Sequence, residues 1–231
     1  MERPAVQGGG MATYQQYCPI ARATEILAER WSLLIVRNLM FGATTFSAIA
    51  QGVPTMSRSM LTKRLRELER AGVITANAKP NGRGSVYGLT DAGADLVEVV
   101  DSLGRWAETW VEVLPEHADP GFALWAWCMV QLNREALPAG RLVVAFEFPD
   151  QRPGNRFFWL LIHNGTAEVC ATDPGGEAEL RIVAQSPAFV DWHRGARSWA
   201  QALRSGDITI TGKRALARVF PTWNTHTPAL A

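Results

Sequence analysis

Cysteine is scarce in this 231-residue chain, and its three cysteines lie far apart at positions 18, 128 and 170. They form no CxxC pair and no even-numbered framework, so we expect neither a zinc site nor a disulfide scaffold. The four histidines show no metal-ligand spacing. The apolar run LWAWCMV is too short to span a bilayer, and the first residues show no basic-then-apolar export signal. These absences predict a cytoplasmic chain with no metal, no cofactor and no membrane partner.

Catalytic signatures are missing as well. The chain has no glycine-rich phosphate loop, no GxSxG and no HExxH. Asp191 and His193 place a carboxylate two residues from an imidazole, but on a helix these side chains point to different faces. We therefore expect no catalytic residues, and not an enzyme.

The composition is that of an ordinary globular protein, with 47% hydrophobic and 19% charged residues and a net charge of +1. The clearest boundary is PEHADPG at residues 115–121, beyond which the pattern of the sequence changes. We predict a flexible leader at 1–16, one domain at 17–114, a linker at 115–121 and a second domain at 122–231.

The first half carries a series of helical patterns followed by a hairpin. The helical patterns are followed by two strand patterns and a longer helix, at residues 20–29, 31–40, 45–51, 57–71, 73–78, 85–89 and 91–113. Asn81-Gly82 between the two strand patterns is a strong hairpin signal. This order is typical of a winged helix-turn-helix domain.

The helix at 57–71 has two opposite faces. At about 100° per residue, Leu61, Leu65 and Leu68 form one stripe. The opposite stripe holds Ser59, Lys63, Arg66 and Arg70. Arginine and lysine bind guanine edges and phosphates, and hydroxyl groups bind phosphate oxygens. The candidate DNA contacts in this helix and the following hairpin are Ser57, Arg58, Ser59, Thr62, Lys63, Arg66, Arg70, Lys79 and Arg83.

Charge is distributed unevenly along this half. Residues 55–85 hold seven basic and two acidic side chains, a net charge of +5, whereas residues 86–115 hold one basic and six acidic, a net charge of −5. A basic helix alone also suits a solvated surface. Because a basic, glycine-rich hairpin follows at winged-helix spacing, DNA binding by counterion release is the favoured interpretation.

Three runs carry a family resemblance: YCPIARATEILAERWSLLIVRNLMFGATTFSAIAQ, MSRSMLTKRLRELERAGVI and VYGLTDAGADL. They resemble the HxlR family of bacterial regulators, relatives of the MarR type, over about Tyr17 to Trp110. The resemblance implies a homodimer of winged helix-turn-helix domains on a palindromic DNA operator. Repression is the expected mode, although the sequence does not determine the sign of regulation. It also implies dimerisation through the N-terminal segment and the 91–113 helix. That helix is rich in apolar residues for one small domain, at Leu96, Val99, Val100, Leu103, Trp106 and Trp110.

Cys18-Pro19 matches the Cys-Pro pair that begins the first helix in this family. Some relatives use that cysteine as a sensor of oxidants or electrophiles, and a helix N-terminus favours the reactive thiolate. Cys18 is therefore a candidate redox residue. The alternative is a small packed cysteine at the dimer contact.

The second half predicts an α+β domain with mostly antiparallel strands. Residues 141–220 resemble the sterol carrier protein type 2-like fold in the runs FFWLLIHNGTAEVC, AELRIVAQSPAFVDWHRG and SGDITITGKRALARVF. This resemblance implies an apolar cavity for a small-molecule effector. The candidate lining residues are Phe158, Trp159, Trp192 and Trp199, although aromatic residues more often fill a core.

Taken together, the sequence predicts an α+β protein with an N-terminal winged helix-turn-helix and a sterol-carrier-like second domain. The predicted function is a dimeric, sequence-specific DNA-binding transcriptional regulator with a ligand-sensing second domain. The alternative is a carrier of small apolar molecules, or an enzyme, that uses the helix-turn-helix as a dimer scaffold. The outward basic stripe favours the first function, because a scaffold has no use for it.

Overall fold

The computed structural model describes residues 13–79 and 84–225. The chain divides into two compact units, residues 1–112 and 113–231. Most of the predicted leader, the tip of the predicted wing and Arg83 lie outside the described residues. Helices and strands occur in both units, and the N-terminal unit has the element order of a winged helix, which confirms the mixed α+β class.

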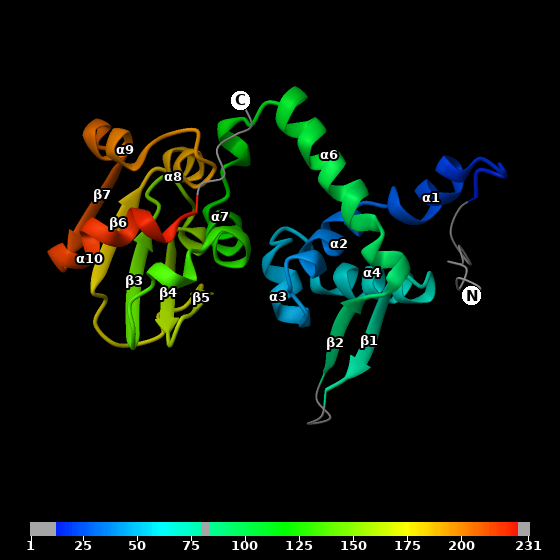
Figure 1. The fold of residues 1–231 in the computed structure, drawn as a ribbon, viewed down its shortest axis with the longest axis horizontal. Coiled ribbons are helices and arrows are strands. Elements are labelled where there is room, and N and C mark those ends of the chain that lie inside the picture. Colours follow the sequence, from blue (N-terminus) through cyan, green and yellow to red (C-terminus); the bar gives the residue numbers. More distant parts are fainter. Residues whose placement is uncertain (1–12, 80–83, 226–231) are drawn as a thin grey trace. The chain divides into compact units, whose positions relative to one another are not determined.

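The N-terminal unit consists of helices followed by a hairpin and two further helices (Figure 1). Its elements are α1 (Pro19–Leu27), α2 (Ser32–Met40), α3 (Phe46–Gln51), α4 (Arg58–Arg70), β1 (Ile74–Ala78), β2 (Ser85–Leu89), α5 (Asp91–Ala94) and α6 (Leu96–Trp110). Thr45 and Ser57 cap α3 and α4, since each side-chain oxygen accepts a hydrogen bond from a backbone N–H in the first turn.

The core of this unit forms between α2 and α4. Ile35 and Val36 of α2 are fully buried, and the predicted leucine stripe of α4 is buried with them, at Leu61, Leu65 and Leu68. Asn38 is a polar member of this core. Its amide donates to the Ile49 carbonyl at 2.9 Å, and its carbonyl accepts from the Arg37 guanidinium at 2.8 Å. The buried amide is therefore satisfied and fixes α2 against α3.

β1 and β2 pair antiparallel, with Ile74 opposite Leu89 and Ala78 opposite Ser85. A third segment joins them, because the Tyr87 N–H donates to the Thr44 carbonyl at 2.8 Å and Thr45 bridges to Val86. The cap of α3 and the base of the hairpin are thus held together.

The entry to α5 is tied to the end of α4. The Thr90 hydroxyl donates to the Gly72 carbonyl at 2.7 Å and accepts from the Gly93 N–H at 3.1 Å. The backbone of Gly93 lies so close to β1 that a Cβ there would be 2.1 Å from the Val73 carbonyl oxygen. Only glycine fits at this position.

The helix predicted at 91–113 is shorter and interrupted. α5 and α6 are separated at Asp95, and α6 ends at Trp110 because Val111 is extended. No residue of α6 is buried within the unit. The apolar side chains predicted for this helix are therefore not buried by the rest of the described chain.

The C-terminal unit mixes short helical turns with a sheet (Figure 1). Its helical elements are η1 (Pro115–His117), α7 (Pro120–Ala126), η2 (Trp127–Gln131), η3 (Arg134–Ala136), η4 (Pro153–Asn155), α8 (Ser186–His193), α9 (Trp199–Ser205), α10 (Arg214–Val219) and η5 (Phe220–Trp223). Its strands are β3 (Arg141–Glu147), β4 (Phe157–His163), β5 (Thr166–Cys170), β6 (Leu180–Ala184) and β7 (Ile208–Gly212).

The five strands form one sheet in the order β5-β4-β3-β6-β7. β3 and β6 are parallel and the other neighbours are antiparallel. The mostly antiparallel sheet predicted from the sequence is confirmed. The parallel pair arises because the chain passes from the edge strand β5 across to β6, on the far side of β3.

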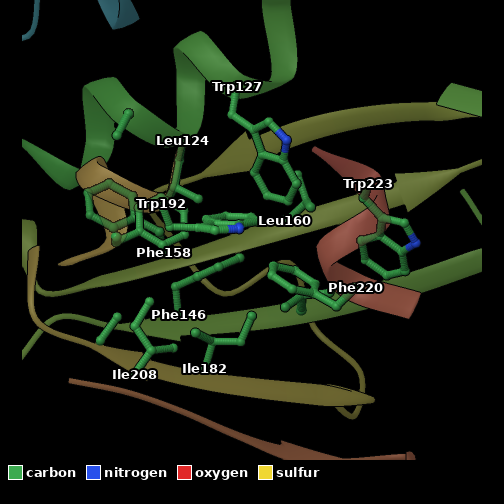
Figure 2. Packing of buried hydrophobic residues seen from close by; sticks show 14 of the residues in the cluster. Leu124, Trp127, Phe146, Phe158, Leu160, Ile182, Trp192, Ile208, Phe220 and Trp223 are labelled. Atoms are coloured by element: carbon green, nitrogen blue, oxygen red, sulfur yellow. The ribbon is translucent and has the colours of Figure 1, made fainter. Parts of the chain in front are cut away.

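One face of this sheet is covered by aromatic side chains from the helices (Figure 2). Trp192 lies near the centre of the cluster, with ring centroids 4.8 Å from Trp199 and 5.6 Å from both Trp127 and Phe220. The Trp199 ring is tilted against Trp192, the Trp127 ring meets it edge-on and the Phe220 ring stacks on it, so the rings fill the space between the helices and the sheet.

The apolar segment at residues 122–136 does not form one continuous helix. α7 ends at Ala126 and continues as a π-helical turn, η2, which ends at Gln131. Leu132 is extended because it bridges to Asn224, and the next backbone N–H, of Asn133, donates to the Trp223 carbonyl at 2.8 Å. Pairing with a segment 90 residues further along the chain ends the helix, and local periodicity does not reveal such a partner.

Over the described part of the chain, no helix is long and apolar enough to cross a membrane.

Two glycine substitutions with opposite expected effects test the close contact at Gly93. Gly93→Ala forces the α5 backbone away from Val73 and should lower the free energy of unfolding by about 1–3 kcal/mol. Gly104→Ala, in the open middle of α6 where nothing lies within 4 Å of a new Cβ, should raise it by about 0.5–1 kcal/mol. Urea titration followed by circular dichroism measures both. A Gly93→Ala variant as stable as the parent would contradict the contact.

Candidate nucleic-acid interface

α4 presents one polar, basic face to solvent. Ser59, Lys63, Arg66 and Arg70 are all exposed, whereas the leucines on the opposite side are buried. Among the described residues, no carboxylate oxygen lies within 4 Å of the Arg66 or Arg70 guanidinium. These two charges are therefore available to an anionic partner.

The start of α4 is held by contacts that orient its basic and hydroxyl side chains. The Arg58 guanidinium lies 4.7 Å from the centre of the Phe46 ring, a cation–π contact with α3. The Thr62 hydroxyl donates to the Arg58 carbonyl at 2.9 Å, and the Ser57 and Ser59 hydroxyl oxygens lie 3.2 Å apart. Arg58 is thus positioned by the neighbouring helix, a contact that the sequence pattern did not reveal.

Arg64 differs from the other basic residues of α4 because it is buried. Its guanidinium pairs with Glu67 at 2.8 Å on the same helix and with Glu29 at 3.0 Å from the segment after α1. Arg64 and Glu67, one positive and one negative residue of the 57–71 helix, thus pair with each other inside the unit. The outward charge remains basic, because Glu67 is largely buried beside Arg64.

The hairpin contributes a further basic residue, Lys79, which directly follows β1. Lys79 is half-exposed, and its backbone N–H donates to the Gly84 carbonyl at 3.0 Å across the base of the loop. Of the nine predicted contact residues, the structure thus places eight on α4, its cap or the hairpin. The ninth, Arg83, falls outside the described residues.

α6 carries the exposed apolar stripe of this unit. Its members recur at helical spacing, and their exposed fractions are 51% for Val99, 47% for Leu103, 56% for Trp106 and 74% for Trp110. Leu96 and Val100 are half-buried beside them. A contiguous apolar stripe of this size is unfavourable when exposed to water, so it indicates an interaction surface.

α1 is anchored by a buried carboxylate. Glu25 accepts hydrogen bonds from the Thr13 hydroxyl at 2.7 Å and from the Tyr14 N–H at 2.8 Å, and it pairs with Arg22. The Thr13 hydrogen bond is the largest of the influences that hold the pKa of this carboxyl below its usual value. The segment before α1 is therefore bound to the helix.

Cys18 occupies the N-cap of α1 as a free, half-buried thiol. Its neighbours Tyr17 and Ile20 are exposed. The redox role predicted for Cys18 stays a prediction. Cys128 is different, because burial raises the pKa of its thiol to about 12.

A groove of about 270 Å³ lies between α1 and the start of α5 and α6. Apart from Arg22 at its edge it is lined by aliphatic residues, namely Ala23, Ile26, Leu27, Val73, Ala92 and Leu96. Sequence reasoning missed this groove, since its walls come from three segments that are each unremarkable in pattern.

The four predicted ligand-lining residues of the C-terminal unit do not form one wall. Phe158, Trp192 and Trp199 belong to the aromatic cluster on the helix-covered face, but Trp159 follows Phe158 on β4 and points to the other face. The expectation of a common wall is corrected for Trp159.

The comparisons with known proteins concern the unit that carries this interface. A family model described as HxlR-like helix-turn-helix matches residues 26–115. The HTH-type transcriptional regulator YvaP of Bacillus subtilis is 35% identical over 99 residues, which make up 42% of this chain and 92% of YvaP. The chain belongs to the HxlR-like helix-turn-helix family.

A second curated relative agrees with this assignment. The HTH-type transcriptional regulator YodB of Bacillus subtilis is 34% identical over 97 residues, which make up 41% of this chain and 87% of YodB. A solved structure of the reduced form of YodB has 32% identity, covers 42% of this chain and 97% of that chain, and gives a TM-score of 0.37. The residues that define this HxlR-like domain run from the end of α1 to just beyond α6.

Two neighbouring arginines of α4 should give different results when replaced. Arg66→Ala removes an exposed charge, so it should weaken binding to a selected DNA duplex about tenfold or more and lower the slope of log affinity against log salt by about 1. Arg64→Ala removes a buried pair, so it should lower the free energy of unfolding by roughly 1–3 kcal/mol.

Fluorescence anisotropy measures the DNA affinity of each variant, and urea titration measures its free energy of unfolding. Arg105→Ala on α6 is the control, because Arg105 is exposed but lies on the acidic helix. Wild-type affinity and salt slope in Arg66→Ala would remove α4 from the interface.

Proposed function

We propose that this protein is a sequence-specific DNA-binding transcriptional regulator that acts as a homodimer on a palindromic operator, with repression as its mode. The observation that carries the proposal is the exposed basic and hydroxyl face of α4, opposite a buried leucine stripe. This arrangement suits a helix placed in the major groove, where phosphate contacts position the protein and base contacts read the sequence. Membership of the HxlR-like family supports it.

Dimerisation follows from the geometry that two recognition helices need. Half-sites of a palindrome lie about one DNA turn apart, so two copies are required. The exposed stripe of α6, with exposed Ile20 of α1 near the N-terminus, offers the apolar surface for that contact. The groove between α1 and α5 is a further apolar surface on the same unit.

The C-terminal unit is proposed to modulate the regulator rather than to catalyse a reaction. Its order of strand hairpin, β6, α8, β7 and α10 supports the sterol-carrier-like resemblance. An apolar effector stays a prediction, and it has to separate aromatic rings that are already in contact. The alternative function, a carrier or enzyme with a scaffold helix-turn-helix, does not require the exposed basic side chains of Arg66 and Arg70.

The decisive experiment is a genome-wide map of the DNA bound by the protein, followed by affinity measurements on the enriched sites. We expect a palindromic motif and a steep fall in affinity with salt, because each copy contributes a basic face. Binding that shows no sequence preference would favour the scaffold alternative.

Charging the α6 stripe should separate the two copies. Trp106→Asp places a carboxylate in the middle of the stripe, so the variant should be monomeric at micromolar concentration and lose at least tenfold in operator affinity. Glu108→Gln changes the opposite side of α6 and serves as the control. Sedimentation velocity and anisotropy measure both properties, and a dimeric Trp106→Asp would show that α6 is not the contact.

Cys18 is expected to tune DNA binding without being required for it. A disulfide or adduct at the N-cap would shift α1, and with it the dimer contact and the spacing of the recognition helices. Operator affinity is measured for the wild type, Cys18→Ser and the control Cys170→Ser, with and without mild oxidant. The same response to oxidant in the wild type and Cys18→Ser would rule out a redox role.

A further inference from the structure

The sheet of the C-terminal unit has a second face on which no helix of the aromatic cluster packs. Cluster residues alternate along each strand, for example Phe158, Leu160 and Ile162 on β4, and every helical member of the cluster lies on that side. The intervening residues of the strands point the other way. They include Trp159 and Leu161 of β4, which are partly exposed.

Strand register gives the layout of this second face. Trp159 lies between Ala145 of β3 and Cys170 of β5, and Ala145 in turn lies beside Arg181 of β6. In the adjacent row, Leu161 lies between Val143 of β3 and Glu168 of β5. The face therefore has an apolar centre with one positive and one negative charge at opposite sides.

One end of the face is already occupied by the chain itself. Arg141 donates to the Pro174 and Gly175 carbonyls in the loop between β5 and β6, and the Glu179 carboxylate accepts from the Val143 N–H at 2.8 Å. Both second-face residues of β3, Val143 and Ala145, are buried within the chain. In the row that contains Trp159, Ala145 and Arg181, the half-buried Trp159 and the exposed Arg181 are the side chains that reach solvent.

We propose that this second face docks against the same face of a second copy of the chain. A two-fold axis parallel to the strands, between β3 and β4, would place each Trp159 over Ala145 of the other copy. The large side chain of each Trp159 then packs across the strand that carries the small, already buried Ala145. At the sheet spacing of about 10 Å that face-to-face packing adopts, both side chains are of suitable length.

The charges are self-complementary under the same axis. Arg181 comes opposite Cys170 of the second copy and diagonal to its Glu168, and the relation holds twice because the interface is isologous. Within one chain the two charged residues belong to β6 and β5, separated by two strands. Three strand spacings amount to about 14 Å, so they cannot pair in the same chain.

This inference rests on the proposed dimer, which supplies the second copy. Two C-terminal units joined to one pair of helix-turn-helix units experience a high effective concentration of each other. A contact that would be weak between free units is then populated. Docking of the C-terminal units would restrict the arrangement of the two recognition helices, which makes the contact a means of regulating operator affinity.

A charge exchange in the full-length protein tests the pairing. Arg181→Glu and Glu168→Arg should each raise the dimer dissociation constant several-fold, and the double variant should return it to within about threefold of the wild type. Arg204→Glu on α9, an exposed arginine of the helix-covered side, is the control and should leave the constant unchanged. Single variants that match the control, or a double variant that adds the two losses, would overturn the proposal.

A covalent measurement uses the native Cys170. In a Cys18→Ser background, Arg181→Cys should form a disulfide-linked dimer under mild oxidant, and the further change Cys170→Ser should abolish it. A cross-link that also forms in Trp106→Asp supports this interface even where the α6 contact fails. A protein that dimerises but gives no Cys170-dependent cross-link overturns this inference alone. If Trp159→Glu lowers the free energy of unfolding but leaves dimerisation unchanged, the face is covered within the chain and the proposal is wrong.

Discussion

The burial of the leucine stripe of α4 determines the rest of the interface. Because Leu61, Leu65 and Leu68 pack against α2, the rotation of α4 about its own axis is fixed. Every third or fourth residue on the other side must then face solvent, and those positions are Ser59, Lys63, Arg66 and Arg70. The Arg64 ion pairs reinforce the same rotation from the flank of the helix. The chemistry offered to DNA is thus a consequence of core packing.

The C-terminal sheet follows the same logic with a period of two. Residues that contact Trp127, Trp192 and Phe220 fill one face, and their neighbours in sequence must occupy the other. A strand with apolar residues on both faces, such as β4, therefore places Phe158 in the core and Trp159 outside it. The filled face accounts for the stability of the unit, and the second face is the one on which we propose the contact with a second copy.

The sequence predicted the elements well where a short local pattern determines them. The leucine stripe, the start of α4 near Ser57, the strands and the exposed stripe of α6 are all periodic or terminal signals. Contacts between distant segments were not predictable. The inward turn of Arg64 depends on Glu29, 35 residues earlier, and the end of the helix at Gln131 depends on Asn224. Trp159 was grouped with Phe158 because composition was weighed without strand alternation.

The three surfaces impose an order on assembly. The basic face of α4 gains affinity in proportion to the number of phosphates contacted, so one copy alone binds DNA weakly and two copies bind much more strongly. In the proposed dimer, the apolar stripe of α6 would bring the two copies together without using any basic side chain of α4. If the proposed dimer forms, any event that changes how the two copies meet, at α6, at Cys18 or at the second face of the sheet, acts on both recognition helices together. The proposal therefore places control of DNA binding in dimer geometry more than in the chemistry of α4 itself.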